Sequence, residues 1–300
     1  MNANSKPHRH RGTVFVEEAE VLEHQGFDGK QFIMKLQAPR TAKDALPGSF
    51  VHLRCSEQRP MRRPLSIMRT DKQKGWIEIL YRVFGEGTEL LSQNPVGSHI
   101  NLMGPIGKPF VLNPERPRPL LLGGGVGIPP MVFIADETRK LKGIYNPMIF
   151  MGSETPFPFK TRPSQIMVPG LPDDTIAAMP LMEDWGIPSR LASQQDFPGV
   201  YQGYITDLAR AWLNTLDNAQ RNEVELFACG PHPMLEAVAK VAQEFDLPCQ
   251  VSLEEFMACA IGGCAGCVVK VHNDDGTTAM KRVCVDGPVF PAEAIFPKAS

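Results

Sequence analysis

The sequence lacks both a long apolar run and an excess of charge of one sign. Its 31 basic and 33 acidic side chains leave a formal net charge of −2, which argues against a nucleic-acid binder that works through bulk positive charge. The most apolar stretch, residues 120–135, is interrupted by four glycines and two prolines, so it is too short and too broken to span a bilayer. Neither a nucleic-acid partner nor a membrane is expected.

The sequence also shows no secretory signal and no internal repeat. Residues 1–12 (MNANSKPHRHRG) are polar and contain no apolar core, which a signal peptide requires. We therefore expect a cytoplasmic protein. In that compartment, clustered cysteines indicate a metal site before they indicate disulfides.

What the chain does contain is enough apolar material for a sizeable core. It is 300 residues long, 43% hydrophobic and 21% charged, and the length alone suggests about two domains. The 26 glycines and 28 prolines exceed ordinary usage, which indicates many turns.

The first part of the chain has the pattern of β-strands. Short apolar segments, several of them alternating, lie between turn residues at 13–19, 31–37, 49–54, 76–82 and 99–103. This spacing predicts a small antiparallel barrel. The linker at 113–119 (NPERPRP) marks a domain boundary.

The second part alternates strand and helix. Strands are expected at 120–122, 147–151 and 224–228, and helices at 131–141 and 234–245. This order predicts a parallel α/β sheet that binds a nucleotide. Between them, residues 155–198 carry eight prolines, so we expect a loop-rich excursion with little regular structure.

Four cysteines near the end of the chain have a diagnostic spacing. Cys259, Cys264, Cys267 and Cys284 follow a C-x4-C-x2-C pattern with a distant fourth member, which is the plant-type [2Fe–2S] spacing. The small residues between them allow the backbone to approach the cluster closely. Zinc held by four cysteines is the alternative, although such sites normally show two C-x2-C-like pairs.

Two glycine turns would lie at the carboxyl ends of neighbouring strands. The first is GGGVGIPP (123–130) and the second is CGPHP (229–233). Glycines followed by a helix allow backbone amides to approach a pyrophosphate. The alternative is a tight turn that binds nothing.

We therefore predict a multi-domain protein. It comprises an antiparallel β-barrel domain (1–114), an α/β parallel-sheet nucleotide-binding domain (115–249) and a small C-terminal [2Fe–2S] module (250–300).

The order of these motifs carries a family resemblance that covers about residues 13–296. RRPLSI (62–67) and LYRVFGEGT (80–88) precede the two glycine turns, and EEFMACAIGGCAGC (254–267) follows them. The chain resembles the ferredoxin–NADP reductase superfamily with an appended [2Fe–2S] module. More narrowly, it resembles the electron-transfer subunits of type B dihydroorotate dehydrogenases.

The resemblance implies that the β-barrel is the FAD domain and the α/β parallel sheet the NAD domain, and it implies a role for each matching residue. Arg63 would contact the FAD pyrophosphate, and the flavin ring would be bordered by Pro64, Leu65 and Ser66. The ribityl and adenosine side would be lined by Leu80, Tyr81 and Arg82, and the phosphates by Gly87 and Thr88. NAD(H) would be held by Gly123, Gly124, Gly125, Gly127, Cys229, Gly230 and Pro231. Ser66 and Cys229 would stand at the reacting atoms, and the four clustered cysteines would ligate the iron.

The function implied is that of an NAD-linked FAD/[2Fe–2S] oxidoreductase subunit. It would pass electrons between an FMN-containing dihydroorotate dehydrogenase catalytic subunit and NAD+, through the cluster and FAD, in pyrimidine biosynthesis. One alternative is a NAD(P)H-dependent ferredoxin or sulfide oxidoreductase subunit with another redox partner, but relatives of that kind tend to have an aspartate where Cys259 stands. A zinc-stabilised binding module without redox activity is the second alternative.

Overall fold

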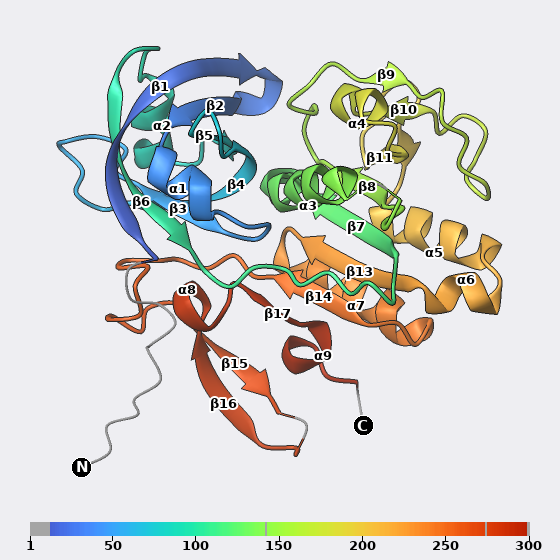
Figure 1. The fold of residues 1–300 in the computed structure, drawn as a ribbon. Coiled ribbons are helices and arrows are strands. Elements are labelled where there is room, and N and C mark those ends of the chain that lie inside the picture. The colour runs from blue at the N-terminus through green and yellow to red at the C-terminus, as the bar shows by residue number, and fades with distance from the viewer. Residues whose placement is uncertain (1–12, 142, 274, 299–300) are drawn as a thin grey trace.

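The structure is a computed structural model that describes residues 13–141, 143–273 and 275–298. The polar residues 1–12, for which the sequence predicts no secretory signal, lie outside the described residues. Three parts of the chain lie against one another: a barrel, a seven-stranded sheet with its helices, and a small cysteine-bearing module (Figure 1).

The barrel is closed by six antiparallel strands in the order β1-β2-β5-β4-β3-β6. Its strands are β1 (Phe15–Phe27), β2 (Gln31–Gln37), β3 (Phe50–Leu53), β4 (Arg63–Asp71), β5 (Trp76–Arg82) and β6 (His99–Ile106). Short helices connect them: η1 (Asp28–Lys30), α1 (Pro39–Asp44) and α2 (Glu86–Ser92). The predicted antiparallel barrel is confirmed.

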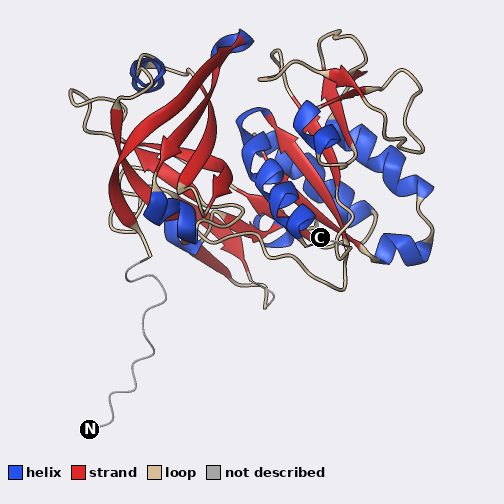
Figure 2. Cartoon of the chain, turned by 45° about the horizontal axis from the view of Figure 1, so that its top comes forward, coloured by secondary structure: helices blue, strands red, loops and turns tan. Residues whose placement is uncertain are grey.

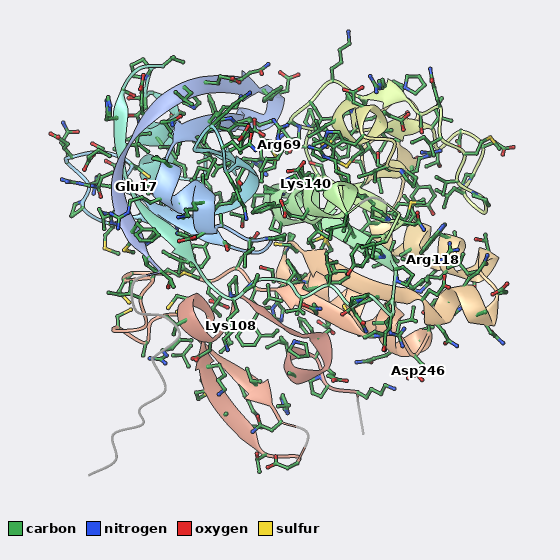
Figure 3. All side chains as sticks on the ribbon, in the orientation of Figure 1. Glu17, Arg69, Lys108, Arg118, Lys140 and Asp246 are labelled. Carbon is green, nitrogen blue, oxygen red and sulfur yellow. The ribbon has the colours of Figure 1, made fainter. Side chains whose placement is uncertain are left out.

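Alternating side chains fill the barrel, as in any strand with one buried face. Val51, Leu53, Ile77, Ile79 and Tyr81 all belong to its buried apolar core. Outside the core, Glu17 accepts hydrogen bonds from the main-chain amides of Arg40 and Thr41, both 2.9 Å long, and so fixes α1 against β1 (Figure 3).

The second part is a sheet in the order β12-β11-β8-β7-β13-β14-β17, parallel except for its last pair. Its strands are β7 (Arg118–Gly124), β8 (Met148–Gly152), β11 (Ser189–Ser193), β12 (Tyr201–Gln202), β13 (Val224–Cys229), β14 (Cys249–Ser252) and β17 (Val289–Pro291). The strand order reverses between β7 and β13, so the predicted parallel nucleotide-binding type of sheet is confirmed, with its switch point there.

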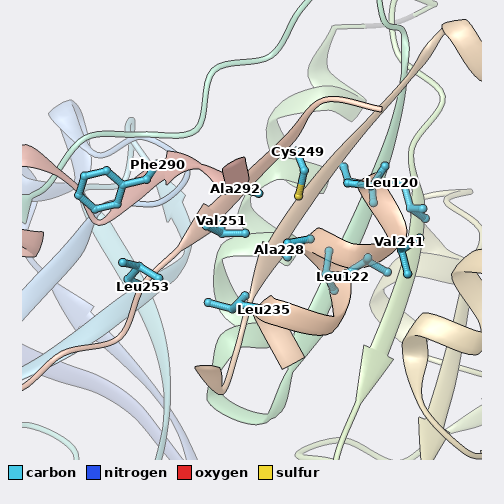
Figure 4. Packing of buried hydrophobic residues seen from close by; sticks show 14 of the residues in the cluster. Leu120, Leu122, Ala228, Leu235, Val241, Cys249, Val251, Leu253, Phe290 and Ala292 are labelled. Atoms are coloured by element: carbon cyan, nitrogen blue, oxygen red, sulfur yellow. The ribbon is translucent and has the colours of Figure 1, made fainter. Parts of the chain in front are cut away.

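Helices cover both faces of this sheet (Figure 2). They are η2 (Gly125–Gly127), α3 (Ile128–Lys140), α5 (Ile205–Thr215), α6 (Asn218–Asn222) and α7 (His232–Glu244). Leu235 and Val241 of α7 pack on Leu120, Leu122 and their neighbours in the sheet (Figure 4). On the other face, α3 lies between the sheet and the barrel, where Phe133 joins the barrel core.

The proline-rich segment 155–198 is more structured than the sequence predicts. It holds β9 (Arg162–Pro163), β10 (Ala177–Ala178), α4 (Pro180–Asp184) and β11. Arg190 of β11 is buried because its guanidinium donates to the carbonyls of Thr175, Ile166 and its neighbour Ser189. The segment also contacts the barrel, where Gln31 Nε2 donates to the carbonyl of Pro156 at 2.5 Å.

The cysteine-bearing module is joined to both other parts. It contains β15 (Val268–His272), β16 (Thr278–Arg282), α8 (Val283–Asp286) and α9 (Ala292–Ile295). β17 then pairs with β14 and so completes the nucleotide-type sheet. The amide of Lys108, just after the barrel, donates to the carbonyl of Gly287 at 2.6 Å (Figure 3).

The predicted domain boundaries fall at two different kinds of place. The first, between 114 and 115, lies in the connection between β6 and β7, whereas the second, between 249 and 250, lies inside β14.

Across the described ranges, none of the helices is both long enough and apolar enough to cross a membrane.

Candidate functional site

Arg63 and the start of α2 form a cationic site on the barrel. A Cβ added to Gly87 would lie 2.8 Å from Nη2 of Arg63, so the glycine allows the guanidinium to rest on the first turn of the helix. The Thr88 hydroxyl accepts from the amide of Phe84 at 2.7 Å and donates to the carbonyl of Gly85 at 3.1 Å. Thr88 therefore shapes this turn with its side chain, while a guanidinium and first-turn amides suit a pyrophosphate.

The predicted flavin-bordering residues divide between the two faces of their strands. Leu65 packs against the barrel core, so Pro64 and Ser66 occupy the opposite, outer face of β4. On β5, Leu80 lies in the apolar layer between barrel and sheet, and Arg82 is exposed. The Tyr81 side chain points into the barrel, where its hydroxyl and the Nε2 of His24 are 2.8 Å apart, so Tyr81 offers only its main chain to a ligand outside.

The two glycine turns lie next to each other, as the register of β7 and β13 requires. Gly123 pairs with Cys229, and a Cβ on Gly127 would collide with the carbonyl of Cys229 and the amide of Gly230. A Cβ on Gly124 would collide with the Met234 side chain, whereas a Cβ on Gly125 would meet nothing within 4 Å. The turns thus form a tight cradle with one open glycine, flanked by Pro231 at the start of α7.

Ser66 and Cys229 differ in accessibility. Ser66 is partly exposed on the outer face of the barrel, whereas Cys229 is buried in the apolar layer between barrel and sheet. Burial above all, together with the charge of nearby Glu254, raises the pKa of the Cys229 thiol, and a hydrogen bond with Ser252 opposes this only partly. The thiol therefore stays protonated at neutral pH and can form a wall of the site rather than act as a nucleophile.

The four clustered cysteines are associated in two pairs. The amide of Cys284 donates to Sγ of Cys267 at 3.5 Å, and burial and the Cys267 thiol raise the pKa of Cys284 to about 12. In the other pair, burial would raise the pKa of Cys259, but the amides of Ile261 and Cys264, the Cys264 thiol and the amide of Gly263 together lower it to about 7.

The loop around these cysteines turns its amides inward. Ala260, Gly262 and Ala265 all have positive φ, between 53° and 81°. The amide of Gly266 donates to Sγ of Cys264 at 3.4 Å. Arg282 closes the loop from outside by donating to the carbonyl of Gly262 at 3.0 Å. Hydrogen bonds from backbone amides stabilise cysteine thiolates and bound clusters.

This paired arrangement fits a [2Fe–2S] cluster. Zinc held by four cysteines normally uses two C-x2-C-like pairs, whereas Cys259 and Cys264 are separated by four residues and Cys284 has no near partner in sequence. A [2Fe–2S] cluster instead takes four thiolates spread over two irons, two on each.

Glu254 is a site residue that the sequence reasoning did not single out. It lies two residues after the end of β14, beside the cradle, because Ser252 of β14 pairs with Cys229. Its side chain is exposed, yet the surrounding protein desolvates it enough to raise the pKa of its carboxyl. A carboxylate at the carboxyl end of a strand was the available signal, but only the neighbouring strand order shows that it lies beside the glycine turns.

The raised pKa of Glu254 predicts a pH-dependent stability. The unfolded chain releases this proton near the ordinary value of 4.5, and the folded chain does so only at higher pH. Between these two values the folded state binds more protons, so its stability falls as pH rises. We expect Glu254→Gln to flatten this decline in thermal unfolding of the full chain between about pH 4 and 8. The same change at neighbouring Glu255 is the matched control, and parallel curves for Glu254→Gln and the parent chain would contradict the expectation.

The barrel, the cradle and the paired cysteines define a class of protein. They describe an FAD-binding, iron–sulfur oxidoreductase that transfers electrons. Residues 17–110 match the family described as an oxidoreductase FAD-binding domain. Residues 254–296 match the iron–sulfur cluster binding domain of dihydroorotate dehydrogenase B.

Whole-chain relatives narrow this class. The chain is 31% identical over 277 residues to the dihydroorotate dehydrogenase B (NAD(+)) electron transfer subunit of Desulforamulus reducens, covering 92% of this chain and 96% of that protein. It is 34% identical over 252 residues to that of Bacillus caldolyticus, covering 82% and 85%. The chain belongs to the family of dihydroorotate dehydrogenase B electron transfer subunits.

Solved structures agree at the level of the fold. An NADH-dependent reduced ferredoxin–NADP oxidoreductase superposes with a TM-score of 0.74 at 25% identity, covering 93% of this chain and 90% of that chain. Phthalate dioxygenase reductase superposes with a TM-score of 0.54 at 15% identity, covering 90% and 77%.

Proposed function

We propose that this chain is the electron-transfer subunit of a dihydroorotate dehydrogenase B. It would pass electrons from an FMN-containing catalytic subunit, which oxidises dihydroorotate, through [2Fe–2S] and FAD to NAD+. The observation that carries the proposal is the adjacency of three sites in one row. The glycine cradle adjoins β14, and β14 leads into the cysteine loop. Met68 of β4 lies in one apolar cluster with Cys229 of the cradle. Phe50, which pairs with Ser66 of β4, packs with Met257 and Ala260 of the loop.

Each site has a physical task in this proposal. Arg63 and the first turn of α2 bind the FAD pyrophosphate, and Pro64 and Ser66 border its ring. Gly123 to Gly127 and Gly230 let the backbone approach the nicotinamide nucleotide. The buried Cys229 and its apolar neighbours exclude water from the place where the two rings would meet. The four clustered cysteines hold the iron.

When bound, FAD exchanges a hydride with NAD(H) and single electrons with the cluster. The chain itself supplies binding, orientation and a dry contact between the sites. It carries no proposed dihydroorotate site, so dihydroorotate oxidation belongs to the partner. We also propose that the cluster module begins at residue 253 and includes α9, that its β17 completes the NAD sheet, and that the FAD unit ends in the connection 107–117.

Co-expression with an FMN-containing catalytic subunit tests the function. We expect a complex that reduces NAD+ with dihydroorotate, and an isolated chain with flavin and iron–sulfur absorption that NADH bleaches. If the bleaching occurs but dihydroorotate never reduces NAD+, the partner is wrong and the reductase class survives. Ferredoxin as acceptor then tests the alternative, which the fold neighbour with a TM-score of 0.74 favours. A colourless protein would refute both.

A further inference from the structure

A cavity of about 410 Å³ lies at the edge of the sheet where its parallel strands begin. It is lined by Arg118, the first residue of β7, by Met148, the first residue of β8, and by Pro188, which directly precedes β11 (Figure 3). The glycine cradle lies at the opposite, carboxyl ends of β7 and β13. The cavity is therefore separate from the proposed nucleotide site, and its volume is in the range of small-molecule sites.

The proline-rich segment 155–198, which the proposed function does not use, supplies one wall of this cavity. Met167 and Trp185 of the segment face Leu141, which follows α3, and Trp212 of α5 across the space. Met167 is 91% exposed and Leu141 is 45% exposed. Large apolar side chains left exposed around a hollow are typical of a surface that binds something.

The lining of the cavity is rich in aromatic side chains. Two of the three tryptophans of the chain, Trp185 and Trp212, line it together with Tyr145. The Tyr145 hydroxyl and the Trp212 indole N–H form no hydrogen bond within the described residues, and neither atom is sealed from solvent. Aromatic walls suit a flat ring, and the two free donors suit a ligand that carries acceptors.

The charges in the lining are of one sign. Arg118 and Arg139 line the cavity, and no carboxylate of the described residues does so. Glu223 accepts from Nε of Arg118 at 2.7 Å, which leaves both Nη groups of Arg118 without a partner in the described part of the chain. The Arg139 guanidinium lies 4.4 Å from the centre of the Trp185 ring. The cavity thus places guanidinium donors next to an aromatic wall.

We propose that this cavity binds a planar aromatic carboxylate, with its ring against the aromatic wall and its carboxylate toward Arg118 and Arg139. The planar fork of a guanidinium matches a carboxylate in geometry as well as in charge. A neutral ring would leave these donors unpaired, and an aliphatic acid would make poorer contact with the aromatic wall. The site is additional to those of FAD, NAD(H) and the cluster, and it does not depend on the proposed function.

Calorimetric titration of the full chain, purified with its cofactors, tests this site. The probe is 2-naphthoate. One comparison compound, 2-naphthalenemethanol, keeps the flat rings without the charge, and the other, cyclohexanecarboxylate, keeps the charge without a flat ring. We expect 2-naphthoate to bind with a Kd of roughly 0.1–1 mM. The neutral alcohol should bind about tenfold more weakly, and the aliphatic acid several-fold more weakly. A saturating concentration of NAD+ should change none of these affinities.

Three substitutions locate the binding. Arg118→Gln should weaken 2-naphthoate roughly tenfold and leave 2-naphthalenemethanol unchanged, a difference that a general loss of structure would not produce. Trp185→Leu should weaken both naphthyl compounds several-fold. Arg162→Gln is the matched control, because Arg162 is also ion-paired with a carboxylate, that of Asp184, but does not line the cavity.

The ion pair of Arg118 with Glu223 is partly exposed, so its loss should cost little stability. If Arg118→Gln nevertheless fails to fold, Arg139→Gln replaces it with the same expected pattern. Absence of binding at millimolar 2-naphthoate would overturn the proposal, as would equal binding of the acid and the alcohol. Displacement of the probe by NAD+ would place it in the glycine cradle, and parent-like affinity in both arginine variants would place it elsewhere, so either result would also refute the site.

Discussion

Replacing Cys284 with serine should remove the cluster and leave the flavin in place. Cys284 is buried and its amide contacts Sγ of Cys267, so serine would remove one thiolate of a pair whose geometry the chain fixes. We expect the iron–sulfur absorption and EPR signal to disappear. Electron delivery to a one-electron acceptor should then fall on the order of 100-fold or more, because loss of a direct ligand exceeds the effect of losing its supporting contacts. NADH should still bleach the flavin.

Cys249→Ala is the matched control for this experiment. Cys249 is also a buried cysteine, but it lies in the sheet among Leu120, Ala228 and Val251 (Figure 4). The Cys249→Ala variant should keep the full iron–sulfur absorption and EPR signal. If Cys284→Ser retained its cluster, the ligand assignment would be wrong. If it lost NADH bleaching together with the cluster, the proposed order of carriers would be refuted.

Gly127→Ala should give the second large effect, on the nicotinamide side. Its new Cβ would collide with the carbonyl of Cys229 and the amide of Gly230. Both are backbone atoms, so the two turns must move apart. A displacement of about 1 Å in a reacting geometry costs on the order of 100-fold in rate, and we expect a loss of that size in flavin reduction by NADH, with FAD content unchanged.

The control for that substitution is Gly26→Ala. A Cβ at Gly26 would lie 3.1 Å from the Phe32 ring, a side chain that can shift, and the site is on the barrel far from the cradle in sequence. Stopped-flow bleaching of the flavin measures both variants. Parent-like kinetics in Gly127→Ala would mean that the nicotinamide nucleotide does not use this cradle.

Features encoded by short local patterns could be predicted from the sequence. The cysteine spacing and the two glycine turns are legible because each requires small residues or thiols at fixed separations. The barrel strands at 31–37 and 76–82 could be predicted because each is a short apolar segment bounded by turn residues. The residues proposed to bind the cluster and the nucleotide therefore lie in the segments that the sequence alone predicts.

Features that depend on distant segments could not be predicted. β11 contains an arginine, and Arg190 is buried only because carbonyls from Thr175 and Ile166 reach it. Tyr81 looks like a flavin contact in sequence, yet the pleat of β5 turns its ring into the barrel. Glu254 lies beside the cradle only because Ser252 of β14 pairs with Cys229 of β13.

Two contacts of the cysteine module bear on the rate of electron transfer. One is the pairing of β17 with β14, and the other is the hydrogen bond from the Lys108 amide to the Gly287 carbonyl. The cysteine module contributes a strand to the sheet on one side and is hydrogen-bonded to the end of the barrel on the other. It is not a carrier on a swinging arm, which must diffuse between donor and acceptor. Electrons that pass between flavin and cluster would tunnel across a constant gap, and solvent viscosity would affect only the meeting of this chain with its partner.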